Sequence, residues 1–474
     1  KYPNAKPQFS PRFGFNYKPF DDENGSLQIR GGTGLFTGTP PYVWISNQAG
    51  NNGVLFGDLN VRAVKDKNDN IISDGRPSLG FTGNMDTYKP AEGSATRSDI
   101  AITDPDFKYP SLWKSNIAAD YKFGDGWVAT IELLYSKDIN AIYHDNIGLY
   151  RTEQFVNDGG AGNARPYYNG YYSDREGNQK AANHVVMLRN TSKGHSLYTT
   201  FQLQKNFVDG ILKGLYLNGS YSFGQSRGVT DGTSSVATSA WKYRAALDGN
   251  AEEVGYTAGS FDGRLLLSAS YTANWSKYAA TSFGLIYQRY RPFRYSYCYN
   301  GDANGDSQFS NDLMYIPANF DEVKDHLLPG DFDSQEDAWK AMNAFIEQDP
   351  YLSKHRGEYA ERNGAVAPFA NQLDLSVSHD IKIYQKNGRS HTLRFSFNIA
   401  NFLNLLNRNW GVVQTTVLGN QQYQFLTIPK GQGPSAANNY TLKYTMAKDL
   451  DETFKDNLND VSRWQMQFGI KYIF

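Results

Sequence analysis

The amino-acid sequence predicts an all-β fold: an antiparallel transmembrane β-barrel with short periplasmic turns and long extracellular loops. In many segments apolar and polar residues alternate, as they do along a strand with one apolar face. No segment approaches the roughly 18 consecutive apolar residues that a membrane-spanning helix needs, and the mean hydropathy is −0.59. The connections between the alternating segments form two classes, short and long, as in outer-membrane barrels.

Seven alternating segments carry the strand prediction. Several of them run for about 11–15 residues, which is longer than a usual strand and long enough to cross a bilayer at a tilt. Polar residues or glycine occupy most of the intervening positions. The positions on the apolar face are Phe13, Phe15 and Tyr17; Leu197, Thr199, Phe201 and Leu203; Leu215, Leu217, Tyr221 and Phe223; Leu265, Leu267, Ala269, Tyr271, Ala273 and Trp275; Leu373, Leu375 and Val377; Leu393, Phe395, Phe397 and Ile399; and Trp464, Met466, Phe468, Ile470, Tyr472 and Phe474.

The connections separate a membrane barrel from a soluble β-sandwich, whose strands also alternate. A sandwich has no reason to place its short connections on one side and its long ones on the other, whereas an outer-membrane barrel does so. The sequence therefore favours the membrane barrel. Short turns are expected at 21–26, 124–126, 208–211, 276–277 and 385–390, and long loops at 36–108, 143–185, 230–260, 297–368 and 406–460.

The number of spanning strands bears on whether the barrel can close. Five hairpins and the final strand make eleven. Bacterial barrels usually have an even number, and lipid requires every edge to be paired. If the short turns face the periplasm, Lys1 lies outside and Phe474 inside. We therefore expect the chain to be one part of a larger barrel that begins within an extracellular loop.

The overall composition excludes several classes of protein. The 47 Lys and Arg nearly balance the 48 Asp and Glu, so bulk charge does not indicate a nucleic-acid partner. The single cysteine, Cys298, cannot form an internal disulfide. The seven histidines are scattered without metal-ligand spacing, and there is no GxSxG, P-loop or GxGxxG motif. We therefore expect no enzyme. The glycines of 31–38 are expected to end a strand rather than to bind phosphate.

One loop segment carries a candidate calcium site. Asp302, Asn304 and Asp306 place oxygen side chains at the first, third and fifth positions of a calcium loop. The twelfth position, where a bidentate acid belongs, is Leu313, and Asp312 comes one place early. A structural calcium ion held by these four polar residues would stiffen the loop. The alternative is a solvated turn rich in Asn, Asp and Gly.

The long loop 297–368 is also expected to contain a helix near 334–348. Ser334 can cap its N-terminus, and Glu336 and Asp337 fall in the first turn, where the helix dipole favours acids. An apolar stripe follows, which either packs on neighbouring loops or forms a docking face for a partner lid, such as a surface lipoprotein. The stripe is Ala338, Trp339, Met342, Phe345 and Ile346.

Two aromatic segments are candidates for substrate binding. The first contains Tyr42 and Trp44, with Asn47 beyond, and the second contains Tyr167, Tyr168 and Tyr171. In the mouth of a transporter, such groups could stack on and hydrogen-bond a polar substrate. The alternative is packing within the loops or an aromatic girdle at the membrane surface.

Several stretches resemble the C-terminal half of TonB-dependent outer-membrane transporters, of the large Oar-like or SusC-like type of Bacteroidetes. They are spread over most of the chain and include the terminal strand. The others are FSPRFGFNY at 9–17, RGGTGLFTGTPPYVWISNQAGNNG at 30–53, YSYCYNGDANGD at 295–306, NDLMYIP at 311–317, YLSKHRGEYAERNGAVAPFANQLDLSVSHDI at 351–381 and FSFNIANFLNLLNRNWG at 395–411.

The resemblance implies a barrel of about 22 strands, of which residues 1–474 would be the C-terminal half. It implies outer-membrane lipid, an N-terminal plug-bearing part of the same protein and a TonB-like energy-coupling protein as partners. The chain lacks the family's plug and TonB box. The end of the chain resembles the signal that the barrel assembly machinery reads, with Phe468, Ile470, Tyr472 and Phe474 on one face.

Three functions follow as hypotheses. In the first, the chain is half of a receptor in the outer membrane of a Gram-negative bacterium and imports a glycan, a peptide or another large nutrient. In the second, it is a structural, adhesin or scaffold barrel within a larger envelope or secretion complex. In the third, it is a soluble carbohydrate-binding β-protein. The sequence does not identify the cargo.

Overall fold

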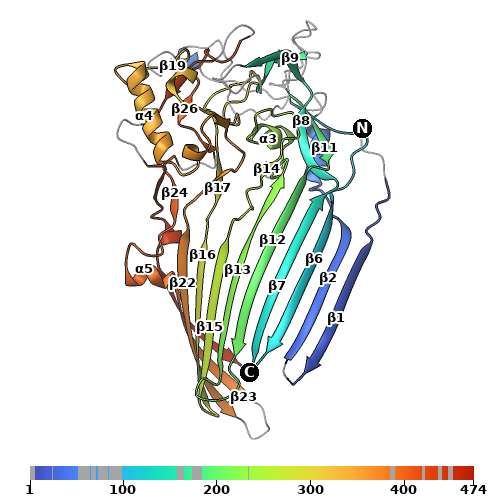
Figure 1. Cartoon of the computed structure of the whole chain (residues 1–474), viewed down its shortest axis with the longest axis vertical. Coiled ribbons are helices and arrows are strands. Elements are labelled where there is room, and N and C mark those ends of the chain that lie inside the picture. Colours follow the sequence, from blue (N-terminus) through green and yellow to red (C-terminus); the bar gives the residue numbers. More distant parts are fainter. Residues whose placement is uncertain are drawn as a thin grey trace.

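The computed structural model describes residues 6–23, 25–51, 64–65, 71–72, 84, 99–156, 165–172, 184–232, 234–384, 390–418, 422–435, 440–446 and 452–474. Its main feature is one long, curved antiparallel sheet with folded loops at one end (Figure 1). No helix within these residues has the length and apolar character needed to span a bilayer.

Eleven long strands follow one another in the sheet in chain order, so every neighbour is the next spanning strand along the chain. This confirms the expected strand number and the antiparallel fold. A short twelfth strand, β14 (Gly255–Tyr256), pairs only with β13. The long strands are β1 (Arg12–Asp22), β2 (Gly25–Thr37), β6 (Ser111–Phe123), β7 (Trp127–Asp138), β12 (Gly194–Asn206), β13 (Leu215–Gly228), β15 (Arg264–Ser276), β16 (Ala279–Tyr290), β22 (Ala370–Tyr384), β23 (Ser390–Ala400) and β29 (Gln465–Ile473).

Short and long connections lie at opposite ends of the sheet, which we call the turn end and the loop end (Figure 1). β1 runs towards the turn end, where the chain also finishes at Phe474. One turn is longer than expected and occupies residues 207–214. Gly210 and Gly214 both adopt positive φ, 66° and 90°, so the chain makes an additional turn before β13 begins.

The stretch 31–38 ends a strand as expected, since β2 finishes at Thr37 and Gly38 begins the loop. Gly31 lies opposite Phe15 on β1 and Ile117 on β6. A Cβ atom at Gly31 would come within 2.8 Å of the Phe15 ring and 2.7 Å of the Asn116 carbonyl oxygen. The glycine therefore gives Phe15 room to lie across the neighbouring strand.

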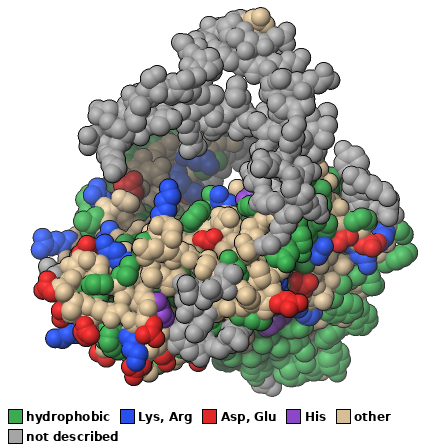
Figure 2. Space-filling view, turned by 90° about the horizontal axis from the view of Figure 1, so that it is seen from above, with side chains coloured by type: hydrophobic (Ala, Val, Ile, Leu, Met, Phe, Trp, Pro, Cys, Tyr) green, Lys and Arg blue, Asp and Glu red, His purple; other side chains and the backbone are tan. Residues whose placement is uncertain are grey.

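The two faces of the sheet differ in chemistry. The apolar side chains of the alternating segments are exposed; Ile131 and Leu133 on β7 and Phe201 on β12 are examples. Viewed from the loop end, hydrophobic side chains gather along one flank of the molecule (Figure 2). Since lipid is the solvent for such a surface, this flank is the membrane-facing side.

The opposite face carries polar side chains that bond across neighbouring strands. Arg30 Nε donates to Asp120 Oδ2 over 2.8 Å, and Gln202 Nε2 donates to Asn218 Oδ1 over 2.7 Å. Arg394 donates two hydrogen bonds to Asp380, over 2.6 and 2.7 Å. This pairing of polar groups is expected of a surface that lines the lumen of a barrel.

The long connections fold into small sheets and helices above the sheet (Figure 1). The strands are β3 (Val64–Lys65), β4 (Ile71–Ile72), β5 (Ile100–Thr103), β8 (Ala141–Asn146), β9 (Leu149–Val156), β10 (Arg165–Tyr171), β11 (Val185–Thr191), β17 (Arg294–Tyr297), β18 (Tyr315–Ile316), β19 (Leu327–Leu328), β20 (Glu358–Tyr359), β21 (Ala365–Val366), β24 (Gln414–Thr416), β25 (Gln422–Tyr423), β26 (Leu426–Thr427), β27 (Leu442–Tyr444) and β28 (Phe454–Asp456). The α-helices are α1 (Val43–Gly50), α3 (Ala237–Lys242), α4 (Gln335–Gln348) and α5 (Phe402–Leu406), and short 3-10 helices span 320–322, 352–354 and 460–462.

Candidate functional site

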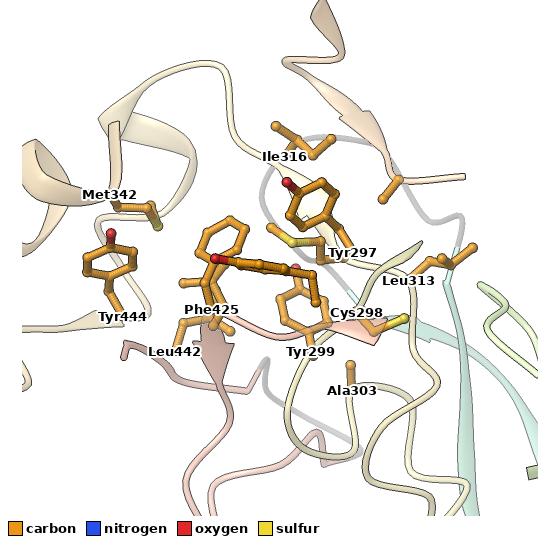
Figure 3. Packing of buried hydrophobic residues seen from close by; sticks show 14 of the residues in the cluster. Tyr297, Cys298, Tyr299, Ala303, Leu313, Ile316, Met342, Phe425, Leu442 and Tyr444 are labelled. Atoms are coloured by element: carbon orange, nitrogen blue, oxygen red, sulfur yellow. The ribbon is translucent and has the colours of Figure 1, made fainter. Parts of the chain in front are cut away.

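The loops that follow β16 and β23 pack together into a lobe with its own apolar core (Figure 3). Tyr297 on β17 and Phe425 meet edge to face with ring centroids 5.8 Å apart, and Phe345 on α4 lies 5.0 Å from Phe425. Parallel pairing of β17 with β25 ties the two loops together. The candidate calcium residues lie in this lobe, and Tyr167 packs in its core.

A buried carboxylate, Asp349, organises the centre of the lobe. Asp349 Oδ1 accepts hydrogen bonds from the backbone N–H groups of Tyr351 and Leu352, over 2.9 and 2.8 Å. Asp349 Oδ2 accepts from the Tyr297 hydroxyl over 2.6 Å and from Thr453 Oγ1 over 2.7 Å. Burial raises the pKa of Tyr297 well above its usual value, so the phenol remains a donor.

The helix of the lobe, α4, begins after Ser334, whose hydroxyl accepts a hydrogen bond from the Asp337 backbone N–H over 3.1 Å. Its apolar stripe is turned into the lobe, where Ala338, Met342, Phe345 and Ile346 are buried. The stripe therefore packs on neighbouring loops, which was the first of the two expectations for it.

The candidate calcium loop is a tight, buried turn. Asp302 Oδ1 accepts from the backbone N–H of Gly305 over 2.6 Å, and Asp302 Oδ2 accepts from that of Ser307 over 2.8 Å. Asn304 Oδ1 accepts from the Asp306 N–H, and Asp306 Oδ1 from the Gln308 N–H. Burial raises the pKa of both Asp302 and Asp306.

Asp312 lies beside this loop but is engaged elsewhere. Its Oδ1 forms a fully buried ion pair with Arg165 Nη1 at 3.2 Å, and its Oδ2 accepts from the Ala303 N–H over 2.8 Å. In the part of the chain that the structure describes, no three or more His, Cys, Asp and Glu side chains are placed to hold a metal ion. Calcium at this loop stays a prediction.

The first aromatic segment is only partly accessible. Trp44 on α1 is buried and donates from Nε1 to the Ser234 carbonyl over 2.7 Å. Asn47 Nδ2 donates to the Ser235 carbonyl over 2.7 Å. Tyr42 is exposed. Trp44 and Asn47 therefore hold α1 against the loop that follows β13, which favours loop packing over substrate binding for these two residues.

The second aromatic segment lies on β10 and is directed inward. Tyr167 and Tyr168 are buried, and the Tyr168 hydroxyl donates to Asp248 Oδ1 over 2.7 Å. Tyr171 is half-buried against His184, and burial raises its pKa to about 12. Packing within the loops again accounts for these residues better than contact with a substrate does.

The residues of the predicted assembly signal lie on β29 and, for Phe474, directly after it. Phe468, Ile470, Tyr472 and Phe474 are all exposed, and the ring of Tyr472 stacks on that of Phe474 with centroids 5.9 Å apart. They end the membrane-facing side of the sheet at its turn end.

Sequence reasoning did not find the residues that organise the lobe. Asp349 directly follows the last residue of α4, and no motif around it indicates a buried acceptor. Arg165 is fully buried, although nothing in its local sequence indicates burial. Both depend on partners from distant segments, which no local pattern reveals.

Comparison with known proteins identifies a family and shows similarity to solved structures. Residues 2–439 match the family described as outer membrane beta barrel domain. The ferric enterobactin receptor PfeA of Pseudomonas aeruginosa, solved as a mutant, is similar at 10% sequence identity with a TM-score of 0.38. That match covers 87% of this chain and 36% of the receptor chain, so the chain spans about a third of that protein. No curated protein matches.

Proposed function

The chain belongs to the outer membrane beta barrel domain family, and from this premise we propose that it supplies half of a TonB-dependent transporter barrel. The protein is located in the outer membrane. The proposed role is non-catalytic import of a glycan, a peptide or another large nutrient. The proposed type is the Oar-like or SusC-like transporter of Bacteroidetes.

The observation that carries this proposal is that both edges of the sheet lack a second neighbouring strand within the described residues. Within the described residues, β1 pairs only with β2 and β29 pairs only with β23. Each edge thus presents a row of backbone N–H and C=O groups, and in lipid each unpaired group costs several kcal/mol. Further strands from another part of the protein would satisfy both edges, and about eleven of them would complete a barrel of about 22.

The polar inner face supports passage of a hydrophilic cargo around or past a plug. Its side chains already bond to one another, as Arg30 does to Asp120, so they form a hydrated wall rather than a closed core. In this proposal the plug comes from the N-terminal part of the same protein, and the energy from a TonB-like partner. A surface lipoprotein could cover the loop end.

The half-barrel can be tested by photo-cross-linking from both edges in intact cells. A photoreactive residue replaces Asn16 on β1 in one variant and Gln467 on β29 in another, and cross-linked products are identified by mass spectrometry. We expect both positions to reach a plug-bearing segment outside residues 1–474. A matched probe at Phe201, on the membrane-facing side in the middle of the sheet on β12, should give cross-links only to β7 or β13.

Two results would count against the proposal. A direct cross-link between positions 16 and 467 would mean that the chain closes a barrel alone. Cross-links to unrelated envelope proteins, together with unchanged nutrient uptake after deletion of the gene, would favour the scaffold or adhesin function instead.

A further inference from the structure

A small pocket at the loop end is lined by three arginines. It has a volume of about 100 Å³ and is formed where the segments that follow β13, β14 and β16 meet. Its polar walls also include three hydroxyls and two amides. The lining residues used below are Arg244, Arg294, Arg362, Asp231, Ala258 and Ser296.

Two of the arginines converge on one backbone carbonyl. Arg244 is 5% exposed and Arg362 is 4% exposed, and an Nη1 atom of each donates to the Val229 oxygen. Their other hydrogen bonds also go to backbone carbonyls: Arg244 donates to Ala251 and Gly249, and Arg362 donates to Gly228 and Gly255. The two positive groups are therefore held side by side without a carboxylate between them.

The charge of this pair is only partly balanced by the protein, because the Glu253 carboxylate favours the charged form of both groups without forming an ion pair with either. Neither Arg244 nor Arg362 forms an ion pair in the described part of the chain, and the Nε atom of each lacks a hydrogen-bond partner there. Arg294, the third arginine, is paired with Asp262. Buried charges without a partner are costly, so a site that retains two of them favours an anionic ligand.

The acid that lines the pocket, Asp231, favours the charged form of Arg362 but forms its hydrogen bonds elsewhere. Asp231 Oδ1 accepts from the Ala258 N–H over 2.8 Å, and Asp231 Oδ2 accepts from Asn363 Nδ2 over 3.1 Å. Burial lowers the pKa of Arg244 to about 10, and the charge of Arg362 adds to this effect. Both guanidinium groups still carry their charge at neutral pH.

We propose that this pocket binds one small oxyanion, a carboxylate or phosphate group, against the guanidinium groups of Arg244 and Arg362. The volume equals that of about three water molecules, which suits a single such group. Planar guanidinium groups match the geometry of both anions. The anion is either a free ion or a group carried by the cargo, and only the cargo source rests on the proposed transport function.

A purely structural role for the arginines is the competing explanation. In that case Arg244 and Arg362 would only clamp the carbonyls of the loops after β13 and α3. The two explanations differ in whether an added anion binds, so the test measures binding directly and not only stability.

The test uses the protein purified from outer membranes in a non-ionic detergent. Isothermal titration with sodium phosphate and with sodium acetate, at constant ionic strength, should show saturable binding at one site per chain. The variant Arg244→Gln should bind at least about tenfold more weakly, because one charged donor is lost. Arg356→Gln is the matched control, since Arg356 also donates to a backbone carbonyl in the loops but lies outside the pocket, and it should bind as the wild type does.

A second variant keeps the test decisive if Arg244→Gln fails to fold. Ala258 is exposed and lines the pocket, so Ala258→Asp brings in a carboxylate without removing any arginine contact. It should abolish phosphate binding while leaving the protein folded. Absence of saturable binding to the wild type, or equal binding by the wild type and both pocket variants, would overturn the proposal.

The source of the anion is resolved by competition. If the site recognises a carboxylate on the cargo, a short peptide with a free C-terminal carboxylate should displace phosphate, whereas the amidated peptide should not. If neither peptide competes while phosphate still binds, the site holds a free anion. That outcome keeps the anion site whether or not uptake assays support the transporter.

Discussion

The Tyr297 hydroxyl donates a hydrogen bond to Asp349 Oδ2 over 2.6 Å, which joins β17 to the residue at which α4 ends. Asp349 in turn accepts from Thr453, which belongs to the loop between β23 and β29. One carboxylate thus connects the two longest loops of the lobe. All of these groups are buried. If the Asp349 carboxylate were removed, water could replace its hydrogen bonds only after local opening of the lobe.

Asp349→Ala should therefore loosen the lobe while leaving the sheet intact. It leaves the Tyr297 hydroxyl, Thr453 and two backbone N–H groups without their acceptor, at a cost of about 3 kcal/mol or more. Hydrogen exchange measured by mass spectrometry should rise across the segments of β17 and α4. Asp331→Ala is the control, because Asp331 is an exposed acid of the same lobe paired with Lys443. Equal protection of the lobe in both variants would contradict the role of Asp349.

The two faces of β12 should respond in opposite ways to a charge. Phe201 lies near the middle of the strand on the membrane-facing side, and Phe201→Arg should cost roughly 2–4 kcal/mol if it reaches the bilayer midplane. Thr200, its neighbour, faces the polar side and bonds to Ser222, so Thr200→Arg should be milder. The fraction of folded protein in outer membranes, measured by heat-modifiable gel mobility, checks this. Equal losses would show that the faces are wrongly assigned.

The sheet could be predicted from the sequence because the alternation of apolar and polar residues along each strand distinguishes its two faces. Alternation at Phe201 or Leu217 depends only on neighbours along the chain and on contact with lipid. The predicted strand number was confirmed for the same reason, as was the division into turns and loops where the structure describes it. The turn expected at 385–390 lies almost entirely outside the described residues. The exception, the turn at 207–214, depends on the backbone angles of Gly210 and Gly214, which composition does not specify.

A methyl group at Gly31 should disturb the edge of the sheet. It would come within 2.8 Å of the Phe15 ring and 2.7 Å of the Asn116 carbonyl oxygen, so Gly31→Ala should displace Phe15, strain the pairing with β6 and cost about 1–3 kcal/mol. Gly14→Ala is the matched control on β1, where the nearest atom is 3.7 Å away. The temperature at which the folded band is lost on gels should fall for Gly31→Ala only. A similar fall for both glycines would mean that crowding by Phe15 is not the cause.

Calcium at the Asp302 loop can be tested without activity measurements. If an ion joins Asp302, Asn304 and Asp306, about 1 mM calcium should slow proteolysis and hydrogen exchange across this loop. Asp306→Ala should lose that protection, whereas Asp331→Ala should keep it. If calcium leaves the wild-type exchange unchanged, the loop is held by its own hydrogen bonds, such as that from Gly305 to Asp302.

The candidate sites were less predictable than the sheet because they depend on long-range contacts. Trp44 and Tyr168 were chosen as aromatic binding residues, yet their positions are determined by Ser234 and Asp248, which lie far away in the chain. Arg244 and Arg362 likewise meet at Val229 only because two loops, between β13 and β15 and between β16 and β22, fold together. An aromatic or basic residue in a loop looks the same in sequence whether it is exposed or buried.

His144 on β8 should make the loop end sensitive to acid. Its ring is buried edge-on to Trp44, with centroids 5.4 Å apart, and its Nε2 has no partner among the described residues. Burial, aided by the charge of Arg244, lowers its pKa from 6.5 to about 4. The folded state therefore resists protonation that the unfolded state accepts, so this stability is complete above pH 6.5 and is lost as the pH falls towards 4. The loss amounts to roughly 2–4 kcal/mol.

Hydrogen exchange around β8, compared at pH-corrected rates, should rise in this window for the wild type. His144→Phe should flatten this rise in exchange with falling pH, whereas the control His355→Phe should not. If the rise persists in His144→Phe, the acid sensitivity comes from the neighbouring carboxylates instead.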